Sequence, residues 1–283
     1  MKKILVVFIS ILILMPEVKS STTSASSYIL MDQNTGRVLL SKDKDSQRLI
    51  ASITKIMTCI LALESGKSED VVIVDDNATS AYGSGIYIEV GEEIKLKDLL
   101  YGLMLRSGND AASMIAAYVS GSVEEFVKLM NNKAKELGMK NTIFYTPSGL
   151  PTPHGNLSSV YDMAILTRYA MQNKEYREIV STKKYKTATN KKTYIWHNKN
   201  KLLKYDYITG GKTGYTEESG RTLVSTANID NMNLIVVTIR DSDDWNTHLE
   251  LYNYAKDNYI SYKVLNKNKC NLIGYTYYKG NTF

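Results

Sequence analysis

The chain has 283 residues, of which 43% are hydrophobic and 23% are charged, and its formal net charge is +6. This apolar content and low net charge are typical of a globular protein and exclude general disorder. With 17 glycines, 4 prolines and no sustained heptad, collagen-like and coiled-coil classes are excluded too. Lysine and arginine are scattered rather than grouped, so we expect no nucleic-acid partner.

The first twenty residues have the layout of a secretory signal peptide. Lys2 and Lys3 form a basic start, residues 4–15 are apolar except for Ser10, and small or polar residues follow. The apolar segment is short for a membrane span. We therefore expect residues 1–20 to direct export and the protein to work outside the cytoplasmic membrane. A buried strand or an uncleaved anchor remains the alternative reading.

Sequence periodicity divides the part after the leader into a hairpin and a series of helices. Residues 21–27 are a polar linker, and residues 28–31 and 37–40 flank a turn, which predicts an antiparallel hairpin. Apolar residues at helical spacing, with capping residues and terminal glycines, predict the helices. These helices cover residues 53–63, 98–105, 110–119, 123–137 and 159–172.

The second half of the chain returns to strands. Residues 181–201 are rich in Lys, Thr and Asn, which predicts a loop or an exposed hairpin. The order of strands, helices, strands and a final helix predicts an α/β (α+β) fold, with an antiparallel sheet built from both chain ends. One unit would span residues 28–260, and residues 261–283 would be a short extension. The late strands and the closing helix cover residues 210–215, 222–227, 234–239 and 245–257.

Cysteine and histidine are too few for a metal centre. The chain has 2 cysteines, 3 histidines and no HExxH motif. Cys59 lies in an apolar run and Cys270 in a polar tail, so we expect two free thiols rather than a disulfide. We expect neither a metal nor a cofactor.

The segment Ser52-Ile53-Thr54-Lys55 is the first candidate for catalysis. Ser52 opens the apolar helix, where the backbone N–H groups and the helix dipole favour developing negative charge. Lys55 lies one helical turn later on the same face. If burial and a second cation lower its pKa, a neutral lysine can take the serine proton. An N-cap serine beside a surface lysine is the simpler alternative.

Two further triplets supply complementary groups. Ser107-Gly108-Asn109 interrupts two helices, so its hydroxyl and amide lie in a loop that could relay a proton and hold a substrate amide. Lys212-Thr213-Gly214 lies on a predicted strand, where lysine and threonine suit an anionic end group and glycine permits close approach. Each triplet alone is also compatible with an ordinary turn or strand end.

In this order the three motifs are those of penicillin-binding proteins and class A β-lactamases. The chain resembles the low-molecular-weight penicillin-binding proteins of the D-alanyl-D-alanine carboxypeptidase family over about residues 28–260. The resemblance implies a penicillin-binding/β-lactamase-like fold, in which helices flank the sheet beside an all-helical subdomain. The matching segments are ASITKIMT at 51–58, DLLYGLMLRSGNDAA at 98–112, KAKELGMKNTIFYTPSGL at 133–150 and GGKTGYTEESGRTLVSTA at 210–227.

The resemblance also implies roles in the hydrolysis of a peptidoglycan stem peptide that ends in D-Ala-D-Ala, and covalent inhibition by β-lactams. Ser52 would be the nucleophile, Lys55 its general base and Ser107 a proton relay. The remaining matched residues would bind substrate: Asn109 the acyl-side amide, Lys212 and Thr213 the terminal carboxylate, Gly214 the approaching backbone, and the N–H groups of Tyr215 and Ser52 the oxyanion.

Some positions depart from the family pattern. Leu157 stands where the family often has a histidine, and His154 lies three residues earlier, so we treat it as a loop residue. Many members carry a carboxylate-binding arginine after the strand that ends near Ile239. Arg240 is the candidate here, although its register is shifted. A C-terminal β domain and a membrane anchor are expected to be missing or reduced, which leaves peripheral membrane or cell-wall association open.

Three alternative functions share these motifs. A class A β-lactamase would need a glutamate in an E-x-x-L-N loop, and no such pentapeptide occurs in the chain. A D,D-endopeptidase that cuts cross-links would use the same residues and stays open. A non-catalytic wall-binding protein is disfavoured because all three triplets are intact.

Overall fold

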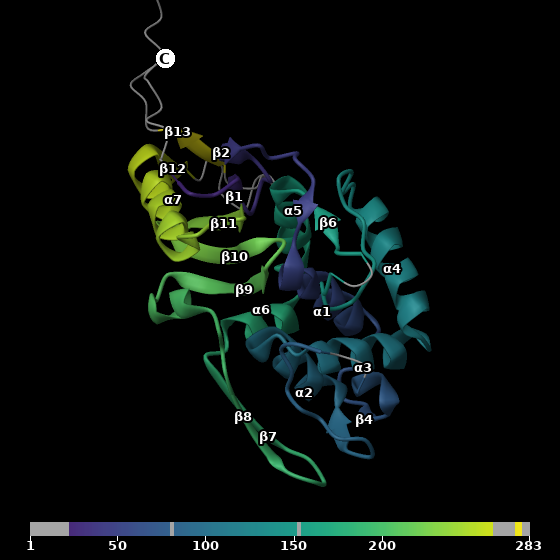
Figure 1. The fold of residues 1–283 in the computed structure, drawn as a ribbon. Helices are drawn as coiled ribbons and strands as arrows, with labels where there is room; N and C mark the ends of the chain where they lie inside the picture. The colour runs from purple at the N-terminus through teal and green to yellow at the C-terminus, as the bar shows by residue number, and fades with distance from the viewer. Residues whose placement is uncertain (1–22, 80–81, 152–153, 263–274, 279–283) are drawn as a thin grey trace, which may run out of the picture.

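The computed structural model of the chain describes residues 23–79, 82–151, 154–262 and 275–278 (Figure 1). The expected signal peptide, Cys270 and most of the C-terminal extension lie outside the described residues. Within them, no helix is both long enough and apolar enough to cross a membrane. No group of three or more His, Cys, Asp or Glu side chains in these ranges could hold a metal ion.

A five-stranded antiparallel sheet is the centre of the fold. Its order is β2-β1-β11-β10-β9, so strands from both ends of the chain lie side by side, as the sequence predicts. The strand β9 lies at one edge of this sheet. It therefore has a neighbouring strand on one side only, and its other side is available for a site. The five strands are β1 (Ser27–Asp32), β2 (Val38–Lys42), β9 (Ile208–Thr216), β10 (Gly220–Ile229) and β11 (Met232–Ile239).

In the part of the chain that the structure describes, seven α-helices surround the sheet or form the region beside it. The helix α7 covers one face, whereas α5, α6 and α1 pack on the other face (Figure 1). The helices α2, α3 and α4 lie beyond α1, in the predicted helical insert. The helices are α1 (Lys55–Glu64), α2 (Leu96–Tyr101), α3 (Asn109–Ser120), α4 (Val123–Glu136), α5 (Val160–Ala170), α6 (Lys174–Ser181) and α7 (Asp244–Asn258).

Four short antiparallel pairs complete the fold. The pair β7–β8 is the exposed hairpin expected within residues 181–201, and it projects away from the sheet (Figure 1). The three others escaped the sequence analysis because all their strands have only two to four residues. The pairs are β3 (Arg48–Leu49) with β6 (Leu157–Ser158), β4 (Val71–Ile73) with β5 (Glu93–Lys95), β7 (Lys184–Ala188) with β8 (Thr193–His197), and β12 (Tyr259–Tyr262) with β13 (Tyr275–Tyr278).

Strand alternation separates two hydrophobic layers. Ile29 and Met31 of β1 face the core shared with α1 and α5, whereas Tyr28 and Leu30 face the core under α7. Both faces are covered, so the strand is buried throughout. The helix α1 is buried from Lys55 to Leu63, so all its sides are covered, as expected of a helix in the centre of a protein.

The structure has the two helix caps that the sequence predicts, and a third cap that the sequence analysis missed. Ser122 accepts a hydrogen bond from the Glu125 N–H, and Ser159 accepts one from the Asp162 N–H, each at 3.1 Å. The helix α6 was not predicted, although Asn173 caps it by accepting from the Tyr176 N–H at 3.0 Å. Its eight residues are too few for a clear periodicity.

His248 of α7 is fully buried in a hydrogen-bonded cluster against the sheet. Its Nδ1 lies 2.6 Å from Ser225 Oγ, and its Nε2 lies 3.2 Å from Thr238 Oγ1. The Tyr252 hydroxyl lies 2.7 Å from the same serine oxygen. Burial lowers the pKa of His248 from 6.5 to about 3.

This burial predicts acid-sensitive stability. Between about pH 3 and pH 6.5 the unfolded chain binds a proton on His248 that the folded protein does not, so stability falls as the pH falls through this window. The slope attributable to this group is at most about 1.4 kcal/mol per pH unit. Urea unfolding at pH 4.5 and pH 7 should show a smaller pH dependence in His248→Gln than in the wild type. The exposed His154→Gln is the control, and equal pH dependence in all three proteins would contradict the assignment.

Candidate active site

Ser52 is the accessible residue of an otherwise buried segment. It lies in a 3₁₀ turn (Ala51–Thr54) that leads directly into α1, and every other residue from Ala51 to Leu63 is buried. Ala51 has a φ of +47°, a left-handed conformation that is unfavourable for a residue with a Cβ. The strained turn therefore presents one hydroxyl at the start of a rigid helix.

Lys55 is fully buried and contacts three oxygens. Its Nζ lies 2.9 Å from Ser52 Oγ, 2.8 Å from Asn109 Oδ1 and 2.6 Å from the carbonyl oxygen of Ser148. The latter two oxygens can only accept, so they match the two N–H groups of a neutral amine. The lone pair of that amine would then face the serine hydroxyl, which can donate.

Electrostatics favour the neutral amine. Burial lowers the pKa of Lys55 well below its usual range, and the positive charges of Lys212 and Lys199 lower it further, while Asp110 opposes the shift. The neutral form is therefore more accessible to Lys55 than to an exposed lysine, which titrates at about 10.4.

Ser107 and Asn109 reach the site from the loop before α3. A π-helical turn (Gly102–Arg106) ends at Ser107, whose φ of +66° is left-handed, and Asn109 begins α3. Both side chains are buried. The Asn109 amide accepts from Lys55 with its oxygen and donates to the Tyr82 carbonyl at 2.6 Å, which holds its orientation.

Lys212 connects the edge strand β9 to this loop. Its side chain is only 2% exposed, and its Nζ donates to Ser107 Oγ at 3.0 Å and to the Thr213 carbonyl at 2.7 Å. Burial and the charge of Lys199 lower the pKa of Lys212 to about 7. Each motif lysine thus contacts the hydroxyl of one motif serine.

Gly214 permits the strand to approach the serine backbone. A Cβ at this position would lie 2.4 Å from Thr222 Oγ1 and 2.9 Å from the backbone nitrogen of Ser52. No side chain larger than hydrogen fits there without movement. The absence of a Cβ brings the main chain of β9 next to the N–H of Ser52.

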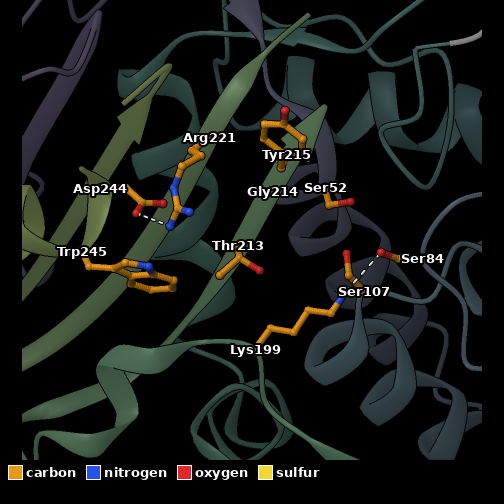
Figure 2. Close-up of a pocket in the computed structure, with 10 residues that line it drawn as sticks. All are labelled: Ser52, Ser84, Ser107, Lys199, Thr213, Gly214, Tyr215, Arg221, Asp244 and Trp245. Atoms are coloured by element: carbon orange, nitrogen blue, oxygen red, sulfur yellow. Dashed lines mark hydrogen bonds and ion pairs between the residues drawn. The ribbon is translucent and has the colours of Figure 1, made fainter. Parts of the chain in front are cut away.

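The motif residues border an open cavity of about 470 Å³ (Figure 2). Ser52 and Ser107 line one part, and Thr213 and the 65% exposed Tyr215 follow along the edge strand. Its lining residues are Ser52, Ser84, Ser107, Lys199, Thr213, Gly214, Tyr215, Arg221, Asp244 and Trp245.

The structure therefore brings together eight of the nine residues singled out from the sequence, and Arg240 lies elsewhere. The strand β11 ends at Ile239, and Arg240 adopts a φ of +54° while its carbonyl accepts from the Ser26 N–H. This turn takes it out of the cavity lining, where Arg221 of β10 is the arginine present. Arg221 forms an ion pair with Asp244 at 2.5 Å.

The sequence analysis missed two residues that help to build the site. One supplies a backbone carbonyl, and the other holds a loop in place. The Ser148 carbonyl binds Lys55, and any residue could supply that atom. The Asn156 side chain holds the Ser148 loop by accepting from the Tyr145 and Thr146 N–H groups at 2.7 and 3.0 Å, respectively. Its amide also donates to Thr54 Oγ1 at 2.9 Å, which ties the loop to the serine turn.

The geometry of the site agrees with comparisons to known proteins. A family described as D-alanyl-D-alanine carboxypeptidase, peptidase S11, matches residues 15–243. The chain belongs to this family. The D-alanyl-D-alanine carboxypeptidase DacF of Bacillus subtilis is 42% identical over 220 residues, which are 75% of this chain and 56% of the relative. DacA of Haemophilus influenzae is 35% identical over 76% of this chain and 57% of its own length.

Solved structures of the family share the fold. Penicillin-binding protein 5 from Haemophilus influenzae has a TM-score of 0.81 and 32% identity, over 89% of this chain and 76% of that one. A D-alanyl-D-alanine carboxypeptidase from Mycobacterium tuberculosis has a TM-score of 0.79 and 28% identity, over 83% and 92% of the two chains. The predicted penicillin-binding fold class is confirmed. This family member spans 56% to 66% of the length of the first three curated relatives.

Gly149 offers a test of the loop that supplies the Ser148 carbonyl. It has a φ of +84°, and a Cβ there would lie 2.0 Å from the carbonyl oxygen of Ala51. Gly149→Ala should therefore lower the free energy of unfolding by about 3 kcal/mol or more, through backbone strain plus a clash. Gly121→Ala is the matched control, because Gly121 has a φ of +83° with no atom within 4 Å. It should lose only about 1 kcal/mol, and equal losses by chemical denaturation would contradict the clash.

Proposed function

We propose that this chain is a serine-type D-Ala-D-Ala carboxypeptidase, which removes the terminal D-alanine from peptidoglycan stem pentapeptides and is acylated by β-lactams. One observation carries the proposal: a fully buried lysine amine lies 2.9 Å from the single accessible hydroxyl of α1 and its preceding turn. Membership in the carboxypeptidase family supports the same substrate class.

Acylation begins with proton transfer from Ser52 to Lys55. The Ser52 Oγ forms a bond to the carbonyl carbon of the penultimate D-Ala, and its proton passes to the neutral Lys55 amine. The resulting oxyanion is held by the N–H groups of Ser52 and Tyr215, which Gly214 allows to come close. The loss of one such donor typically raises the barrier by about 3 kcal/mol.

Collapse of the tetrahedral intermediate expels the terminal D-Ala. The bond between the carbonyl carbon and nitrogen breaks, and the leaving nitrogen takes a proton through the Ser107 hydroxyl. Lys212, 3.0 Å from that hydroxyl, stabilises negative charge on it and attracts the substrate carboxylate. Water then hydrolyses the ester, with Lys55 as the base, and restores Ser52.

The terminal carboxylate would be bound by Thr213 and Lys212 on β9. Lys199 and the ion pair of Arg221 with Asp244 line the same cavity as Thr213, and the Arg221 side chain is 40% exposed. Arg221 is therefore a better candidate than Arg240 for the carboxylate-binding arginine expected from the family. The amide of Asn109 would bind the acyl-side amide of the peptide.

The substrate also defines where the protein would work. Stem peptides lie outside the cytoplasmic membrane. The proposal therefore includes export directed by residues 1–20 and action at the cell wall or at the outer face of the cytoplasmic membrane. Residues 28–260 would be the catalytic unit. The protein would associate peripherally with the membrane or with the cell wall. Cell-fractionation with and without residues 1–20 would test the location.

Covalent labelling is the most direct test of the proposed nucleophile. Incubation with penicillin should add one equivalent to the intact mass, because the ester on Ser52 would deacylate slowly. Ser52→Ala should show no adduct. Ser41→Ala, the serine of another S-x-x-K segment, should label like the wild type. An adduct that persists in Ser52→Ala would contradict the assignment.

The two lysines should behave differently when each is replaced by methionine. Lys55→Met removes the base, so acylation by peptide and by penicillin should fall by at least about a thousandfold. Lys212→Met removes charge from the carboxylate site, so KM should rise while a measurable rate persists. Stopped-flow acylation and D-Ala release would measure both, and near-normal acylation in Lys55→Met would refute the general-base role.

The pH dependence should follow the same division of roles. Lys55 must be neutral, and its pKa is lowered, so kcat/KM should fall on the acid side well below pH 10. Lys212 must be charged, and its pKa is about 7, so kcat/KM should also fall as the pH rises above that value. The result is a bell-shaped profile, and Lys212→Met should lose its alkaline limb. A profile that rises steadily to pH 10 would contradict both assignments.

A further inference from the structure

The hairpin β7–β8 and the residues next to it carry a concentration of positive charge. Residues 179–205 contain eight lysines and no aspartate or glutamate. The whole chain has a net charge of only +6, so the residues outside this segment have a net charge of −2. The segment is thus an exception to the otherwise scattered distribution of lysine, and charge of one sign on a projecting hairpin suits a partner of opposite charge.

The lysines of β7 lie on the outward face of the hairpin, which projects away from the central sheet (Figure 1). Strand alternation exposes Lys184 and Lys186, whereas Tyr185 and Thr187 beside them are only partly exposed. Lys183, directly before the strand, is exposed as well. Among the described residues these three lysines have no hydrogen-bond or ion-pair partner. Their charges are therefore available to another molecule.

The inward face anchors the hairpin to the helical region. Tyr185 stacks on Tyr101 of α2, with ring centroids 3.6 Å apart, and donates to the Asp98 carboxylate at 2.5 Å. The Tyr194 hydroxyl of β8 lies 3.0 Å from the Glu92 carboxylate. Both carboxylates are bound on the side of the ribbon opposite to the lysines, so they hold its position without neutralising the outward face.

Two further cations connect the hairpin to the active-site cavity. Arg106, directly before the second motif serine, lines a cavity of about 490 Å³ together with His197 at the end of β8. Lys199 follows two residues later, lines the active-site cavity and donates to Ser84 Oγ at 3.1 Å (Figure 2). Basic side chains therefore continue from the hairpin to the edge of the cavity that contains Ser52.

These cations are close enough to oppose one another. Burial and the charge of Arg106 lower the pKa of Lys199, and burial and the charge of Lys199 lower the pKa of Lys212 to about 7. Within the part of the chain that the structure describes, Arg106 has no hydrogen-bond or ion-pair partner. A row of unpaired like charges does not stabilise the folded chain, whereas a bound polyanion would relieve the repulsion.

We propose that the outward face of β7–β8 is a docking surface for polymeric peptidoglycan, and that Arg106 and Lys199 guide its stem peptides to Ser52, an inference that rests on the proposed function. Each stem pentapeptide ends in a carboxylate, so a glycan strand that carries many stems is a polyanion. Stems beside the one in the active site would bind the hairpin lysines. The preferred substrate is then the polymer rather than a free peptide.

The continuity of the cations with the cavity favours this partner over a second anionic polymer. A phosphodiester polymer would bind to the exposed hairpin lysines, and such binding would give no role to Lys199 inside the active-site cavity. A polymer that also carries the substrate would contact both the hairpin and the cavity. The substrate strand therefore accounts for the whole row of charges.

The experiment measures D-Ala release by the full mature protein from a soluble pentapeptide and from uncross-linked glycan strands that carry pentapeptides. The triple variant Lys183→Gln, Lys184→Gln and Lys186→Gln should lower kcat/KM for the strands by about tenfold at low ionic strength, because a surface of one charge sign concentrates a substrate of the other by roughly tenfold or more. The pentapeptide should stay within about twofold. At about 1 M salt, where the screening length is about 3 Å, the difference should largely disappear.

Two control variants separate local charge from net charge and from folding. Replacing the same three lysines by arginine keeps the charges and should leave both substrates close to wild-type rates. The variant Lys128→Gln, Lys135→Gln and Lys140→Gln removes three exposed lysines in and after α4. It changes the net charge equally, and it should affect neither substrate by more than about twofold.

The outcomes distinguish this inference from the proposed function. Unchanged turnover of the strands in the hairpin variant, or equal losses in the α4 variant, would overturn the docking surface and leave the carboxypeptidase proposal standing. Equal losses on pentapeptide and strands would overturn it too, because the hairpin would then support the site as a whole. Co-sedimentation with poly(glycerol phosphate) that the hairpin variant loses, without any loss on the strands, would assign the surface to the other polymer. No D-Ala release from either substrate would overturn both proposals.

Discussion

Two buried lysine amines each contact a serine hydroxyl, and the other features of the site depend on this arrangement. Two positive charges this close would repel each other in a poorly solvated site. The protein lowers both pKa values instead of supplying a buried carboxylate partner to each amine. The neutral form of Lys55 is stabilised by two acceptor oxygens, from Asn109 and from the Ser148 carbonyl. The contact of the Ser52 hydroxyl with an amine of lowered pKa is a consequence of this electrostatic constraint.

Rigid elements hold these groups from three directions. The helix α1 is buried on all sides, so Ser52 and Lys55 keep one relative position. The edge strand β9 brings Lys212 and Gly214 against the serine turn, which an internal strand could not do without losing a neighbour. The loop at Ser148 is held by Asn156 and requires glycine at position 149. The position of each of these groups is thus set by a helix, a strand or a loop that is itself held by contacts elsewhere in the fold.

The same arrangement separates the two sides of the scissile bond. On the acyl side Asn109 is held by Lys55 and the Tyr82 carbonyl, which leaves little freedom. Along β9 the surface opens into a cavity lined by Thr213, Arg221 and Trp245. A site with one rigid side and one open side would select the acyl residue closely and tolerate leaving groups of different size.

What the sequence alone determined is local. Three short motifs identified the chemistry-bearing side chains, because a nucleophile, its base and an anion site need particular residue types at particular spacings. Turn residues between strands, apolar residues at helical spacing and capping serines such as Ser122 and Ser159 predicted most of the elements for similarly local reasons. The tertiary structure decided what depends on distant segments. The Ser148 carbonyl is a backbone atom that any residue could supply, so the sequence gives no sign of it. Arg221 rather than Arg240 lines the cavity, because β11 ends at Ile239 and the chain turns away at Arg240. Lys199 and Trp245 reach the cavity from the segment after β8 and from α7, and no spacing in the sequence shows that the fold brings these two segments together.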